Sequence, residues 1–93
     1  MNGRRVIWPG PIRAKLVSFR SPHFTPEETF DFIAQFAMEA EDLLLNPIFS
    51  QLYTEERGEF KGLSRCVIRG FRVYSEFVGN DVVVLAVKFP REN

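Results

Sequence analysis

Residues 64–91, with the sequence SRCVIRGFRVYSEFVGNDVVVLAVKFPR, decide the fold of this chain. Two runs rich in β-forming residues, 71–78 and 81–88, flank the dipeptide Gly79-Asn80. A two-residue loop that contains glycine predicts a β-hairpin, because the tight turns between antiparallel strands require positive φ.

The two runs of this hairpin differ in polarity. Residues 82–87 include no polar side chain, which predicts a central strand that is buried on both faces. Residues 71–78 alternate, and this predicts a strand with one polar face. Three side chains share that face: Arg72, Tyr74 and Glu76.

A third strand is predicted just upstream, at residues 64–69, with Gly70 as a tight link to the hairpin. Its alternation places three side chains on one side: Arg65, Val67 and Arg69. Guanidinium groups on a sheet can hold phosphates, stabilise developing negative charge or bind an acidic partner, and arginine chemistry alone does not choose among these.

One long helix is predicted from Thr25 to the Asn46-Pro47 pair. Thr25 can cap it, Pro26 suits the first helical position, and Glu28 completes a capping box. Pro47 disfavours helical geometry in the residue before it, so the helix should end there. The apolar residues follow helical spacing on one stripe, which predicts a core side facing the sheet: Phe30, Ile33, Ala37, Ala40 and Leu44, with Phe36 and Leu43 beside them.

The remaining segments complete a small α+β fold. Loose alternation over residues 12–19 predicts a first strand, and residues 48–53 predict a short helical turn. The sequence therefore predicts an N-terminal strand and one long helix, plus that helical turn, packed on a twisted antiparallel sheet of about four strands. Residues 12–93 form the single domain. Residues 1–11 form a basic N-terminal arm, either a disordered tail or a strip that packs through its tryptophan.

The net charge is zero, but the charges are unevenly distributed. Residues 1–24 contain five basic residues and no acidic one, whereas residues 25–59 contain nine acidic residues and one basic residue. Residues 60–93 contain six basic and three acidic residues. This pattern predicts an acidic helix and a basic sheet, hence a dipolar molecule, although ordinary solvated faces give the same distribution.

Several functional classes lack support in the sequence. Cys66 is the only cysteine, so an internal disulfide and a cysteine-based zinc site are excluded. No phosphate-binding glycine loop occurs, and the lone His23 has no neighbour at ligand spacing. We predict no metal and no cofactor. The basic N-terminus lacks the apolar run of a signal peptide, and no stretch approaches membrane-spanning length, which predicts a cytoplasmic protein without membrane contact.

The chain resembles the RelE/ParE superfamily, the toxins of bacterial type II toxin–antitoxin systems. The resemblance rests on the last thirty residues and on a first-helix pattern at residues 28–34. The features that match are, in order, Gly70-Phe71-Arg72-Val73-Tyr74, the Gly79-Asn80 turn, Val82–Val87 and Arg91-Glu92. It implies one or two N-terminal helices packed on a twisted antiparallel sheet of about four strands. It also implies a cognate antitoxin whose C-terminal segment wraps the toxin.

Members of this superfamily act in two ways, and the resemblance leaves both open. Some cleave mRNA in the ribosome with lysines, arginines and a tyrosine of a C-terminal helix, whereas others inhibit DNA gyrase by binding. Arg72 matches the sheet arginine of the ribonucleases, and Arg91 matches the arginine after their last strand. Arg65 and Arg69 stand near the positions of their two catalytic lysines, and the sequence ends at Asn93 without the helix that bears the tyrosine.

The first prediction is therefore a ParE-like toxin that inhibits its target by binding. Its binding residues would be Arg72, Tyr74, Lys88 and Arg91. The alternative is a RelE-like ribosome-dependent endoribonuclease, whose catalytic residues would be Arg65, Arg69, Arg72 and Arg91. A third possibility is a non-catalytic member of the family that only binds a partner. Whether the protein is an enzyme stays open, and the expected partners are an antitoxin with acids facing the basic sheet and either gyrase or the ribosome with its mRNA.

Overall fold

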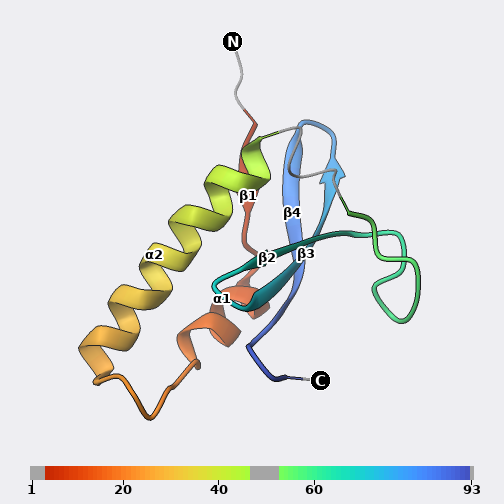
Figure 1. Ribbon diagram of the computed structural model, residues 1–93. Coiled ribbons are helices and arrows are strands. Elements are labelled where there is room, and N and C mark those ends of the chain that lie inside the picture. The colour runs from red at the N-terminus through yellow and green to blue at the C-terminus, as the bar shows by residue number, and fades with distance from the viewer. Residues whose placement is uncertain (1–3, 47–52, 93) are drawn as a thin grey trace.

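The computed structural model describes residues 4–46 and 53–92 as two helices and a four-stranded sheet (Figure 1). The elements in chain order are β1 (Val6–Ile7), α1 (Gly10–Val17), α2 (Pro26–Leu45), β2 (Ser64–Ile68), β3 (Phe71–Val78) and β4 (Asp81–Lys88). The strands lie in the order β1-β4-β3-β2. The fold is α+β, as predicted.

The predicted hairpin forms with the predicted turn. β3 pairs with β4 in antiparallel register from Arg72↔Lys88 to Val78↔Asp81. Gly79 has a φ of 63°, the positive value that the first central residue of a type II′ turn requires. Arg69 and Gly70 connect β2 to β3 with φ values of 53° and 84°, a pair of positive angles typical of a type I′ turn.

β4 is a central strand, as predicted, but only one of its faces is fully buried. Val82, Val84 and Val87 are at most 1 % exposed, whereas Leu85 is 41 % exposed. The pairing shifts from Tyr74↔Ala86 to Ser75↔Val84, so Leu85 is the extra residue of a β-bulge. The uniformly apolar sequence of residues 82–87 does not indicate that one face of β4 is partly exposed. That exposure depends on how much of the face other segments of the chain cover.

α2 begins as the sequence predicts. The Thr25 hydroxyl accepts a hydrogen bond from the Glu28 amide at 3.1 Å, and the Glu28 carboxylate accepts one from the Thr25 amide at 2.8 Å. The helix ends at Leu45, just before Asn46. Its buried residues Phe36, Ala40 and Leu44 pack on one face of the sheet, with the Phe36 ring 4.5 Å from that of Phe71.

The strand predicted at residues 12–19 is wrong, because most of this segment is helix α1. Ile12, Leu16 and Phe19 fit the i, i+4, i+7 spacing of a helix as well as they fit alternation, and all three join the core. Pro9 caps the helix and Pro11 lies in its first turn, where a missing N–H costs nothing. These prolines therefore lie at the start of a helix.

The N-terminal strand lies instead at Val6–Ile7, and it makes the sheet mixed rather than purely antiparallel. β1 runs parallel to β4, with Val6 opposite Val82. The Trp8 indole N–H donates to the Glu41 carboxylate of α2 at 2.7 Å, so this part of the arm is packed. Of the helical turn predicted at residues 48–53, all but Tyr53 lies outside the described residues.

Candidate functional site

Three of the predicted cations lie on the face of the sheet that points away from α2. We call this surface the open face; its side chains include Arg65, Val67, Arg72, Tyr74, Lys88 and, farther along β3, Glu76. Pairing fixes their positions, because β-strand neighbours directly opposite each other share a face. The acidic side chains of α2 belong to the helical layer on the opposite face of the sheet. The basic sheet face and the acidic helix are therefore separated, as the sequence predicts.

Arg72 and Lys88 are direct cross-strand neighbours on the open face, where β3 begins and β4 ends. Like charges directly opposite on a sheet destabilise it, in contrast to opposite charges. A local rule broken in this way is commonest at functional sites, where an anionic partner can offset the repulsion. Two adjacent cations suit a carboxylate or a phosphate, since Arg offers a bidentate fork and Lys a point charge.

Aromatic rings border the cations. The Phe60 ring stacks on Tyr74 with centroids 4.4 Å apart, and the Lys88 ammonium lies 5.6 Å from the Phe60 centroid. The Arg65 guanidinium lies 4.2 Å from the ring centroid of Tyr53. Tyr74, predicted to bind a partner, is only 3 % exposed, so Phe60 and not Tyr74 forms the surface.

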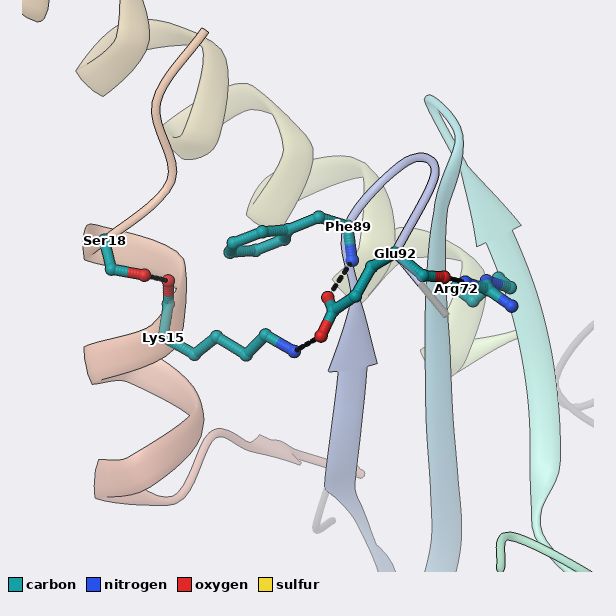
Figure 2. Close-up of polar contacts among 5 residues, drawn as sticks. All are labelled: Lys15, Ser18, Arg72, Phe89 and Glu92. Carbon is teal, nitrogen blue, oxygen red and sulfur yellow. Dashed lines mark hydrogen bonds and ion pairs between the residues drawn. The ribbon is translucent and has the colours of Figure 1, made fainter. Parts of the chain in front are cut away.

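The chain after β4 folds back against Arg72. The Arg72 guanidinium donates to the backbone carbonyl of Glu92, while the Glu92 carboxylate accepts from Lys15 of α1 and from the Phe89 amide, each at 2.8 Å (Figure 2). In Figure 2 Glu92 lies between α1 and the sheet. This residue therefore links the first helix, the last strand and the open face, and we call the contact set of Lys15, Arg72, Phe89 and Glu92 the C-terminal clamp.

The clamp explains the acidity of Glu92. The hydrogen bond from Lys15 lowers its pKa most, the Phe89 amide adds to this, and the charges of Lys15 and Lys88 act in the same direction. Burial opposes these effects but does not outweigh them. Glu92 thus stays ionised to lower pH than an ordinary glutamate and places one anion near the Arg72–Lys88 pair.

Arg69 lies apart from the other predicted arginines. Its side chain turns toward α2, where it donates two hydrogen bonds to Glu39 at 2.9 and 2.8 Å and lies 5.3 Å from the ring centroid of Phe32. The pairing lowers the pKa of Glu39 and raises that of Arg69. Alternation had placed Arg69 beside Arg65, but the turn after Ile68 takes it off the strand. Arg69 is a link between the β2–β3 turn and α2.

Arg91 lies in the exposed chain after β4, with a φ of 68°. The structure therefore brings Arg65, Arg72 and Lys88 onto one face, places Arg91 beyond its end, and leaves Arg69 on the opposite layer. Sequence reasoning missed Lys15, Phe60 and Glu92. No local pattern links these residues, since Lys15 and Glu92 meet only because α1 packs beside the end of β4.

A second surface feature is an apolar groove between α1 and α2. It has a volume of about 300 Å³ and its apolar walls include Val17, Phe30, Ala34 and Ala37. Phe30 is 75 % exposed and Val17 is 71 % exposed, which is unusual for large apolar side chains on adjacent helices. Phe30 was predicted to be core because it belongs to the helical stripe, and this prediction is wrong.

Within residues 4–46 and 53–92, no group of three or more potential metal ligands occurs, and no helix is long and apolar enough to cross a membrane. Comparison with protein-family models, curated proteins and solved structures gives no match.

Proposed function

We propose that this protein is the toxin of a type II toxin–antitoxin module and inhibits its target by binding, in the manner of ParE-like toxins. One observation supports this most directly: the adjacent cations Arg72 and Lys88 on the open face. Such a pair favours an anionic surface as its partner.

The architecture is consistent with the proposal. The sequence resemblance implies one or two N-terminal helices on a four-stranded sheet, and the described chain has two helices on a sheet of four strands. A shared fold is compatible with many activities, so this agreement supports the family and not the target.

The open face favours binding over RNA cleavage. General-base catalysis requires a group that can accept a proton near neutral pH, and arginine remains protonated there. Tyr74 lies beneath Phe60, where a substrate cannot reach its hydroxyl without displacing that ring. The two nearest carboxylates are not placed for this role: Glu92 accepts hydrogen bonds from Lys15 and the Phe89 amide, and Glu76 lies four residues along β3 from Arg72, about 13 Å away.

The antitoxin of this module should present acidic side chains to the open face. A carboxylate of that kind would occupy the space beside Arg72 and Lys88 and so exclude the target. DNA gyrase is the target we propose, in keeping with the ParE-like resemblance.

Induced expression in a bacterial host tests the proposal. We expect growth arrest by the wild type, relief by Arg72→Gln combined with Lys88→Gln, and persistence of arrest in the matched control Arg57→Gln with Lys61→Gln. The control removes the same charge from an exposed loop. Growth arrest without inhibition of purified gyrase would contradict gyrase as the target. Normal growth during expression of stable wild type would contradict the toxin function itself.

The alternative is a RelE-like endoribonuclease, favoured by the suitability of Arg72 and Lys88 for a phosphate. It predicts cleavage of ribosome-bound mRNA by the wild type and loss of cleavage in Arg72→Ala with Arg91→Ala. Cleavage that survives this double substitution would contradict the assignment of these arginines. A partner that binds without growth arrest or cleavage would instead indicate a non-catalytic member.

A further inference from the structure

We propose that the groove between α1 and α2 is the interface of a symmetric homodimer. This inference does not rest on the toxin function. The groove is an apolar surface that the monomer leaves open. The two helices beside it have opposite charge, since α1 with the turn after it is basic and α2 is acidic, which makes this face complementary to a second copy of itself.

The apolar part of the interface is a strip along α2. Phe30, Ala34 and Met38 follow i, i+4 spacing, and both Phe30 and Met38 are more than two-thirds exposed, at 75 % and 68 %. Val17 of α1 lies across the groove from this strip and is 71 % exposed. Large apolar side chains gathered on one surface mark association sites in soluble proteins.

The size of this face is compatible with a small dimer. α2 has 20 residues and is therefore about 30 Å long, with α1 packed beside part of it. Standard interfaces bury about 800 Å² per partner, centred on a few large apolar or aromatic side chains. Phe30 would be the central residue of this kind.

Charge identifies the occupant as a second copy. α1 and the turn after it contain Arg13, Lys15 and Arg20 and no acid, whereas α2 contains six acids and no basic residue. Arg13 shares the outer face of α1 with Val17. On α2, Asp31 borders the strip beside Ala34 and Asp42 borders it beside Met38. A two-fold axis through the groove sets α1 of each copy against α2 of the other, so the dimer has two equivalent contacts between a basic and an acidic helix.

Sedimentation equilibrium of the purified chain alone tests this arrangement. We expect a monomer–dimer equilibrium that Phe30→Glu weakens by about tenfold or more, because it places two carboxylates at the centre of the interface. Val78→Glu is the matched control, since Val78 is 53 % exposed but lies at the far end of the hairpin. Circular dichroism checks that each variant is folded.

Charge reversal tests the symmetry. Arg13→Glu alone, and Asp31→Lys with Asp42→Lys alone, should each weaken the dimer, because each brings like charges together. Mixing the two variants restores both opposite-charge contacts, so a heterodimer should form in native mass spectrometry. A monomer at all concentrations, a dimer unaffected by Phe30→Glu, or failure of the mixed variants to associate would overturn the proposal. Growth arrest is not measured here, so failure of this inference is distinct from failure of the toxin proposal.

Discussion

Backbone conformation at single residues determines how the β2–β3 turn meets the chain after β4. Gly70 has a φ of 84°, and a Cβ atom at this position would lie 3.2 Å from Cγ of Pro90. Gly62 has a similar φ of 91° but no neighbour within 4 Å of such an atom. Substitutions at these two glycines therefore distinguish the free-energy cost of a left-handed backbone, which both share, from the cost of crowding, which arises only at Gly70.

We predict that Gly70→Ala destabilises the protein more than Gly62→Ala does. The left-handed conformation costs an L-residue about 1–2 kcal/mol, and this contribution is common to both substitutions. Only the alanine at position 70 must also displace Pro90. Urea unfolding of the two variants measures the difference. Equal free energies of unfolding would show that the Pro90 ring moves aside without destabilising the fold.

The C-terminal clamp makes stability depend on pH through Glu92. The folded-state pKa of Glu92 lies below its ordinary value, so its contribution is present above that ordinary value and is lost as pH falls through the folded pKa. Because Glu92 is partly exposed, solvent screens this contribution and its size is modest.

We predict that Glu92→Gln lowers the urea midpoint at neutral pH and reduces its fall between about pH 5 and pH 3. The exposed Glu59→Gln is the control for removal of one carboxylate from the chain. The same acid dependence in wild type and Glu92→Gln would mean that the clamp contributes nothing to folding.

At the scale of elements, α2 has two apolar sides with different roles. Phe36 is fully buried against Phe71, whereas Phe30 on the same helix is 75 % exposed on the groove. The helical stripe in the sequence includes both phenylalanines, because its width covers the core side and the groove side together. Burial against the sheet selects one of them for the core.

We predict that Phe36→Ala lowers the free energy of unfolding by about 3–5 kcal/mol, the usual cost of emptying a buried aromatic site. Phe30→Ala should change it by no more than about 0.5 kcal/mol when measured on the monomer at low concentration. Thermal or urea unfolding of both variants compares two identical chemical changes on one helix. A large loss for Phe30→Ala at low concentration would place its ring in the core instead of on an interface.

At the scale of the whole molecule, segments far apart in sequence close the fold. β1 pairs with β4, Trp8 donates to Glu41, and Lys15 binds Glu92. Residues 6–15 are thus tied to α2, to β4 and to Glu92. This arrangement argues for one cooperative unit and against a loosely attached arm.

We predict that Trp8 fluorescence and far-ultraviolet circular dichroism report the same urea transition. Trp8 is the only tryptophan, so its emission follows the docking of the N-terminal segment, while circular dichroism follows the whole fold. Coincident midpoints are the signature of two-state unfolding in a small domain. An earlier fluorescence transition would show that β1 and Trp8 detach before the rest unfolds.

The sequence determined the elements whose signals are local. The Gly79-Asn80 turn with its flanking runs specified the hairpin, and the capping box of Thr25 and Glu28 specified the start of α2. Within single strands the candidate site was predictable to the same extent: alternation placed Arg72 with Tyr74 and Arg65 with Val67, whereas the register between the strands brought the two pairs onto one face. These predictions succeeded because the interactions involve residues within a few positions of one another.

Only the tertiary structure decided the conformation of segments whose local sequence fits more than one element. Residues 12–19 fit both a strand and a helix, and contact of Ile12, Leu16 and Phe19 with the core selects the helix. Arg69 leaves the open face because a turn with positive φ directs it to Glu39. Lys15 and Glu92 meet across 77 positions of sequence, and such a contact exists only once the helix and the sheet have packed together.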